Sequence, residues 1–130
     1  MAMNFCTHLM FDGTAEEAMK FYVGLFPGSE IRHAVYYGEG ENQGKVQLAA
    51  FTLSGAEFLC IDTPIKHDFG FTPAMSIFVD CETFEEIDQV YAALVEGGQA
   101  LMPLDNYGFS QRFGWVQDRF GVSWQINLPS

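Results

Sequence analysis

The chain has 130 residues, the size of one domain, and 48% of them are hydrophobic types, which excludes a disordered protein. The chain has six Lys and Arg residues and 17 Asp and Glu residues. The resulting net charge of −11 argues against binding to nucleic acids or anionic membrane surfaces. No apolar run reaches the roughly 20 residues of a membrane span, and the N-terminus lacks the basic, apolar pattern of a signal peptide. The three cysteines have no CxxC spacing and indicate reduced thiols. We therefore expect a cytoplasmic protein.

The first half of the chain predicts one strand, one helix and three further strands. Alternating apolar residues predict a strand over residues 4–11. A helix follows, opened by Thr14 and Glu17 as a capping box and ended by Pro27 and Gly28. Strands are then predicted over residues 30–37, 46–53 and 57–62, with the glycine-rich residues 38–44 as a hairpin turn.

The second half predicts the same order of elements after a linker over about residues 64–72. A strand is predicted over residues 74–80, and a helix follows that opens with Thr83 and Glu86 and ends at Gly97 and Gly98. Three further strands, predicted over residues 99–103, 112–117 and 122–128, complete the second half.

The two helical segments are copies of one design. A shift of 69 positions places Thr14 on Thr83, Tyr22 on Tyr91 and Gly28 on Gly97. We expect two βαβββ modules, about residues 1–63 and 73–130, in an α+β fold. Each module alone leaves one sheet face and two strand edges open, so the modules should pair.

A doubled βαβββ unit of this length resembles the vicinal oxygen chelate superfamily, which includes glyoxalase I, bleomycin-resistance proteins and extradiol dioxygenases. Residues 9–18, 76–81 and 118–126 narrow the resemblance to the PhnB-like branch, also called 3-demethylubiquinone-9 3-methyltransferase-like; Asp118-Arg-Phe-Gly-Val-Ser-Trp124 is the most specific stretch. The resemblance implies cupped mixed sheets and a homodimer. Methyl transfer is not expected, because no GxGxG turn follows a strand and no length remains for a Rossmann-like sheet.

The resemblance also implies where a divalent metal would bind, on the first and last strands of each module. These positions hold His8 and Gln125, while the other two fall on residues that are poor ligands or none, Leu59 and either Ser76 or Ala74. A catalytic site of the zinc type needs about three protein ligands. We therefore expect no tightly bound metal and no cofactor; the alternative is a divalent metal held by His8, Glu57 and Gln125.

Strand alternation predicts a cavity of mixed polarity. On the last strand the odd-numbered residues from Ser123 should face the cup and Trp124, Ile126 and Leu128 the helices. On the first strand Phe5, Leu9 and Phe11 should face the helix. The expected lining is Cys6, His8, Met10, Ser76, Phe78, Gln125 and Asn127. Tyr107 and Arg112 are candidates for its mouth or lid, although Arg112 also suits an ordinary ion pair with the surplus carboxylates.

Three functions fit this cavity. The first is binding of an unidentified small organic molecule without a resident metal, with any reaction unknown. The second is a metal-dependent enzyme of glyoxalase or dioxygenase type. The third is sequestration of a drug or toxin, as in bleomycin resistance. A Cys6–His8 nucleophilic pair is a weaker alternative, because a half-buried Cys is more often an apolar filler. Cys60 and Cys81 are expected to be structural.

Overall fold

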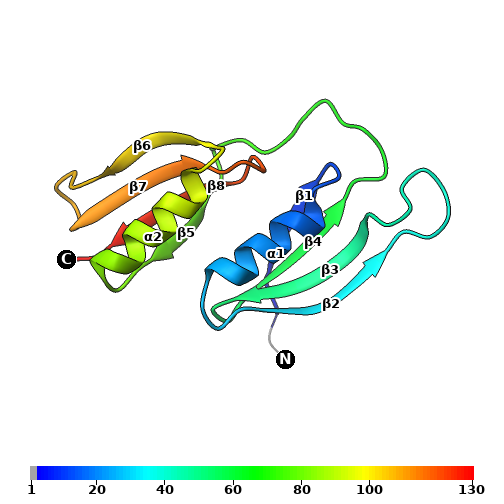
Figure 1. The fold of residues 1–130 in the computed structure, drawn as a ribbon, viewed down its shortest axis with the longest axis horizontal. Coiled ribbons are helices and arrows are strands. Elements are labelled where there is room, and N and C mark those ends of the chain that lie inside the picture. The colour runs from blue at the N-terminus through cyan, green and yellow to red at the C-terminus, as the bar shows by residue number, and fades with distance from the viewer. Residues whose placement is uncertain (1–2) are drawn as a thin grey trace. The chain divides into compact units, whose positions relative to one another are not determined.

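The computed structural model describes residues 3–130 and contains two compact units, one ending at Asp68 and the other spanning Phe69–Ser130. The first unit contains β1 (Thr7–Phe11), α1 (Ala15–Leu25), β2 (Glu30–Tyr36), β3 (Val46–Leu53) and β4 (Ala56–Asp62). The second contains β5 (Ile77–Asp80), α2 (Phe84–Val95), β6 (Gln99–Asp105), β7 (Arg112–Gln117) and β8 (Ser123–Leu128). The predicted order of elements is confirmed (Figure 1).

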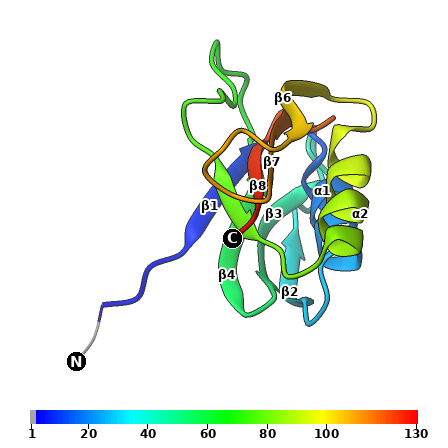
Figure 2. The same cartoon turned by 90° about the vertical axis from the view of Figure 1, so that its left-hand side faces the viewer.

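Each unit is one four-stranded mixed sheet with a helix on one face. The strand orders are β1-β4-β3-β2 and β5-β8-β7-β6. The first strand of each unit pairs in parallel with the last, and the other pairs are antiparallel. In Figures 1 and 2, α1 lies across one face of its own sheet and α2 does the same in the second unit. The opposite face of each sheet carries no helix of its own unit.

Apolar side chains beneath the helices form the core of each unit. Tyr22 and Met19 of α1 are fully buried in the first unit, and Trp124 and Ile126 of β8 are fully buried in the second. The buried set confirms the alternation expected of β8, with Trp124, Ile126 and Leu128 on the helix side.

Several strand ends differ from the sequence prediction. β1 begins at Thr7, and Phe5, expected to face the helix, is 83% exposed before it. β5 likewise begins at Ile77 rather than residue 74. β6 continues past Pro103 to Asp105, because an edge strand tolerates a residue with no N–H to donate.

The prediction of a capping box at the start of α1 is wrong. The capping box predicted for α2 is present in a modified form. Thr14 makes no side-chain cap hydrogen bond; instead Asp62 Oδ1 accepts from the N–H groups of Gly13 (2.8 Å) and Ala15 (2.9 Å). The same carboxylate accepts from Val46 N at 2.9 Å through Oδ2, so it joins β4, β3 and the start of α1. In α2, Thr83 Oγ1 accepts from Glu86 N, while Glu86 accepts from the N–H of Glu82.

A second buried carboxylate holds the turn between β7 and β8. Asp118 Oδ1 accepts from Phe120 N (2.9 Å) and Val122 N (3.0 Å), and Oδ2 accepts from Trp124 Nε1 at 2.9 Å. Gly121 within this turn has a φ of +95°, which L side chains rarely adopt. The Asp-Arg-Phe-Gly-Val-Ser-Trp stretch therefore builds a turn, and its carboxylate is committed to backbone and indole donors.

Candidate functional site

The polar residues of β8 lie on the face of the second sheet that is opposite α2. We call this face the open face. Ser123, Gln125 and Asn127 alternate with the residues under α2; Ser123 is buried, and Gln125 and Asn127 are half-buried. Their register partners on β7 are Gln117, Trp115 and Phe113, and those of Gln125 and Asn127 on β5 are Phe78 and Asp80. Three rows of side chains thus cross this face.

A hydrogen-bond network joins the row of Ser123 to the row of Gln125. Ser123 Oγ lies 2.7 Å from Ser76 Oγ and accepts from Trp115 Nε1 at 2.9 Å. Gln125 Nε2 donates to Ser76 Oγ at 3.4 Å. The network links the segment before β5 with β7 and β8, so it fixes the indole of Trp115 on the open face. The side chain of Trp115 is half-buried here.

Asn127 carries an unsatisfied acceptor. Its Nδ2 donates to Asp80 Oδ1 at 2.9 Å, which orients the amide. Its Oδ1 is buried and, alone among the buried side-chain N and O atoms of residues 3–130, has no hydrogen-bond partner. Buried polar atoms nearly always have a partner, so this oxygen is a position where a ligand donor would be stabilising.

An aromatic cluster lies beside Asn127. Phe113, its register partner, is 6% exposed and contacts three rings, with centroid separations of 5.1 Å to Phe109 and 6.4 Å to both Tyr107 and Phe78. The three outer rings are exposed, Phe109 by 62%, Phe78 by 56% and Tyr107 by 40%. Tyr107 donates its hydroxyl to the carbonyl of Pro103, which holds the β6–β7 loop in place. Four rings with one buried centre form an apolar platform.

Arg112 lies on the other face. Its register partner is Leu128, and its Nη2 donates to Asp88 Oδ1 of α2 at 3.0 Å. Its guanidinium also lies 5.8 Å from the ring centroid of Phe84. The structure therefore favours the ion-pair interpretation of Arg112, whereas Tyr107 is one of the four rings of the platform.

The other predicted lining residues belong to the first unit. His8 and Met10 lie on the open face of its sheet, where their register partners are Leu59 and Ile61. Cys6 is exposed just before β1. The predicted lining residues therefore belong to two different units, and Ser76, Phe78, Gln125 and Asn127 belong to the second unit.

The donor set does not fit a three-ligand metal site within either unit. His8 lies opposite Leu59, which has no donor atom, and Glu57 is two residues farther along β4. Gln125 belongs to the other unit, where it already donates to Ser76. Residues 3–130 contain no group of three or more His, Cys, Asp or Glu side chains placed to hold a metal ion.

Cys60 and Cys81 are both buried. Burial raises the pKa of Cys60 to about 12, and the nearby Asp62 carboxylate adds to the shift. Burial likewise raises the pKa of Cys81 to about 11, with smaller contributions from Glu86 and Asp80. A thiol must ionise to act as a nucleophile, so these two are unreactive at neutral pH.

Sequence reasoning missed Trp115, Phe113, Phe109, Asp80 and Asp105 as members of the open face. The alternation of β7 carried the signal for the first two, since Phe113, Trp115 and Gln117 alternate with Gly114 and Val116. The contribution of Phe109 depends on the course of the β6–β7 loop, which sequence periodicity does not specify.

Comparison with known proteins agrees with this architecture. The profile of the family described as 3-demethylubiquinone-9 3-methyltransferase matches residues 3–127. The chain is 52% identical to the PhnB protein of Bacillus cereus, which carries the same methyltransferase description, with 97% of this chain and 99% of that chain covered and a TM-score of 0.94.

More distant solved structures share the fold. Protein PA1353 of Pseudomonas aeruginosa is 23% identical over 98% of both chains, with a TM-score of 0.86. The fosfomycin resistance protein FosX of Listeria monocytogenes is 11% identical over 100% of this chain and 95% of its own, with a TM-score of 0.68, and its structure contains Mn(II) and 1S,2S-dihydroxypropylphosphonic acid. No curated protein matches this chain.

The family match covers nearly the whole chain, and the two βαβββ units are those of the glyoxalase-like fold. The chain belongs to the family described as 3-demethylubiquinone-9 3-methyltransferase, together with the PhnB protein of Bacillus cereus.

Proposed function

We propose that this protein binds a small organic molecule on the open face of the β5-β8-β7-β6 sheet. The ligand would lie on the platform of Phe78, Tyr107, Phe109 and Phe113 and donate a hydrogen bond to Asn127 Oδ1. The observation that carries this proposal is the buried, unpartnered Oδ1 next to rings that remain exposed. An apolar surface with a few fixed polar groups is the usual composition of a small-molecule site.

The polar groups near the platform are already oriented. The amide of Asn127 is held by Asp80, and Gln125 and Trp115 are held through Ser76 and Ser123. Groups fixed before binding lose little conformational entropy when the ligand arrives. Because Asn127 Oδ1 is itself buried, a ligand donor would reach it only when a neighbouring side chain moves aside, while the sheet keeps its arrangement.

We propose that binding requires no resident metal, because the acceptor and the rings come from one unit that has no set of metal ligands. His8, Met10 and Cys6 remain proposed lining residues of the first unit. We also propose that the protein is a cytoplasmic homodimer, consistent with its reduced cysteines and exposed strand edges. The described part of the chain has no helix long and apolar enough to cross a membrane.

Benzyl alcohol tests the proposal, because it combines one ring with one hydroxyl donor. In ¹H–¹⁵N spectra recorded with EDTA, we expect it to shift the Asn127 side-chain amide and the Phe113 backbone amide. Asn127→Leu keeps the volume but removes the acceptor, and we expect about tenfold weaker binding, the loss of roughly one hydrogen bond. Benzyl methyl ether, which has no donor, should bind wild type and Asn127→Leu equally.

The control is Gln99→Leu, an equivalent change on the edge strand β6 away from the rings. It should bind benzyl alcohol like wild type. Shifts confined to residues outside the β5-β8-β7-β6 sheet, or binding that disappears with EDTA, would contradict the proposal.

A further inference from the structure

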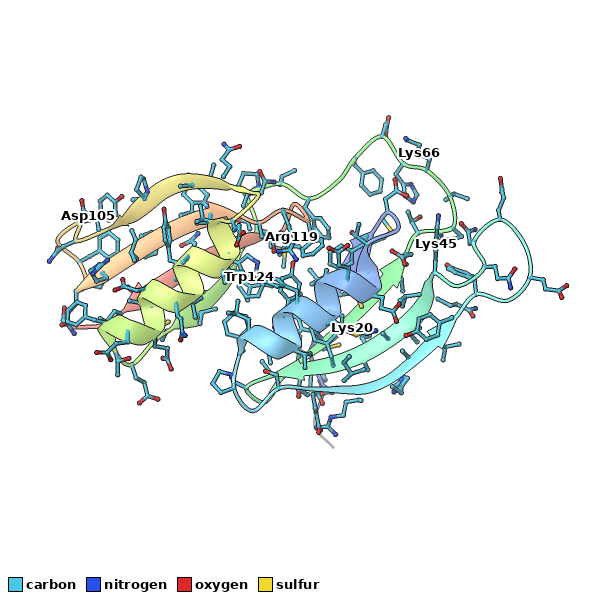
Figure 3. The ribbon with its side chains drawn as sticks, viewed as in Figure 1. Lys20, Lys45, Lys66, Asp105, Arg119 and Trp124 are labelled. Carbon is cyan, nitrogen blue, oxygen red and sulfur yellow. The ribbon has the colours of Figure 1, made fainter. Side chains whose placement is uncertain are left out.

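Two carboxylates flank the aromatic platform. Asp80, Asn127, Phe113 and Asp105 are successive register partners across β5, β8, β7 and β6. Adjacent strands are about 4.8 Å apart, so a ligand above Phe113 would lie about 5 Å from the Asp105 strand and about 10 Å from the Asp80 strand. Asp105 is at the end of β6 that leads into the β6–β7 loop (Figure 3). Each end of this row is therefore negatively charged.

No basic side chain of residues 69–130 forms an ion pair with these carboxylates. Residues 69–130 contain eight acidic and two basic side chains. Arg112 is paired with Asp88 on the helix side, and the guanidinium of Arg119 lies 4.5 Å from the ring centroid of Phe120 in the β7–β8 turn. Within the described residues, Asp80 and Asp105 take part in no ion pair. The open face thus keeps a negative potential.

The aromatic rings of the platform also favour a positively charged ligand. The face of a Phe or Tyr ring attracts a cation, by about 0.5–1 kcal/mol at exposed sites and about 2 kcal/mol when the cation is desolvated. An amide oxygen such as Asn127 Oδ1 accepts the N–H of an ammonium group and repels an anion. Rings, amide oxygen and carboxylates all favour the same sign of charge.

We infer that the ligand is an organic cation, an ammonium group on an aromatic or aliphatic body. This inference rests on the proposed function and specifies the class of molecule that the site takes. The apolar body covers Phe113 and the outer rings, and the ammonium donates to Asn127 Oδ1 between the two carboxylates. Carboxylate and phosphate ligands are excluded from this face by the same charges.

The test compares three probes that share one ring: benzylammonium, benzyl alcohol and benzoate. We expect benzylammonium to shift the Asn127 and Phe113 amide signals with at least tenfold tighter binding than benzyl alcohol, and benzoate to leave them unshifted. The preference for benzylammonium should fall as the salt concentration rises, because the carboxylates are exposed and therefore screened.

Substitutions that remove only charge locate the source of the preference. Asp80→Asn keeps the oxygen that accepts from Asn127, and Asp105→Asn keeps the oxygen that accepts from Asn106 N. The double variant should bind benzylammonium several-fold more weakly and benzyl alcohol unchanged. Glu85→Gln removes one charge from the first turn of α2 and serves as the matched control, with wild-type binding of both probes.

The outcomes separate the two proposals. If benzyl alcohol and benzylammonium bind equally at Asn127 and Phe113, the cation inference is wrong and the proposed function stands. If benzoate binds most tightly there, the cation inference is also wrong. If none of the probes shifts these residues, both proposals are wrong.

Discussion

The polar side chains of the second sheet fall into two groups, those whose hydrogen bonds are made within the protein and one that keeps an unpartnered atom. Ser76, Ser123 and Trp115 satisfy one another, so their polarity is used within the protein. Asn127 differs, because only its amide nitrogen has a partner. The distinction depends on hydrogen-bond geometry, and residue type alone does not reveal it.

Because the pKa of Cys60 is raised, the free energy of unfolding should fall as the pH rises in the alkaline range. The folded pKa of about 12 exceeds the ordinary 9.0, so the stabilising contribution of this thiol is complete below pH 9 and is lost as the pH rises toward 12. By pH 10 the unfolded thiol has ionised and the folded one has not, which costs about 1 kcal/mol of unfolding free energy. Cys60→Ala should therefore flatten the decline between pH 8.5 and 10.5, measured by urea denaturation.

Cys6→Ala is the control, since the thiol of Cys6 is exposed and should leave the alkaline decline unchanged. An identical pH profile for Cys60→Ala and wild type would contradict the assignment of this decline to Cys60.

Among the elements, the β7–β8 turn depends on one buried carboxylate. Asp118→Asn keeps an oxygen for the two backbone donors but places an NH₂ group against Trp124 Nε1, and we expect a loss of about 2 kcal/mol of unfolding free energy. Asp118→Ala removes every acceptor and should lose about 3–5 kcal/mol. Chemical denaturation measures both.

Trp124→Phe provides the matched background because it removes the indole donor. In that background Asp118→Asn should cost about 1 kcal/mol less than in the wild type, since the indole N–H that would lose its acceptor is absent. An undiminished cost would show that the Trp124 contact is not the cause.

The elements themselves were predictable because their signals are local. Alternation gave β3 and β7 at their observed bounds, and the glycine-rich residues 38–44 form the turn between β2 and β3 as expected. The cap of α1 was not predictable, since Asp62 is 47 residues from Ala15 and replaces the hydroxyl of Thr14. The aromatic platform was missed for the same reason, because Phe78 and Phe109 meet Phe113 only through tertiary structure.

At the scale of the whole molecule, exposed edges and apolar side chains favour self-association. β1 and β2 are the edge strands of the first sheet, and β5 and β6 those of the second. Val35 and Leu48, neighbours on β2 and β3 of the first sheet, are both exposed. Unpaired edges and exposed apolar surface are usually covered in stable proteins.

We therefore expect analytical ultracentrifugation to give about twice the chain mass of 14.6 kDa. Leu48→Asp should weaken the dimer at least tenfold, whereas Gln43→Asp adds the same charge in the exposed turn between β2 and β3 and should not. A chain that sediments as 14.6 kDa at every concentration would contradict the homodimer.

The Asp118 turn has a consequence for what the family resemblance says about the ligand. The most specific stretch of the family resemblance is occupied in closing a corner of the backbone, on the side of β8 that underlies α2. Mutations in the exposed rows can accumulate without touching it. Two members can thus share this signature and differ entirely in what they bind, and a substrate cannot be transferred between them on the strength of the signature alone.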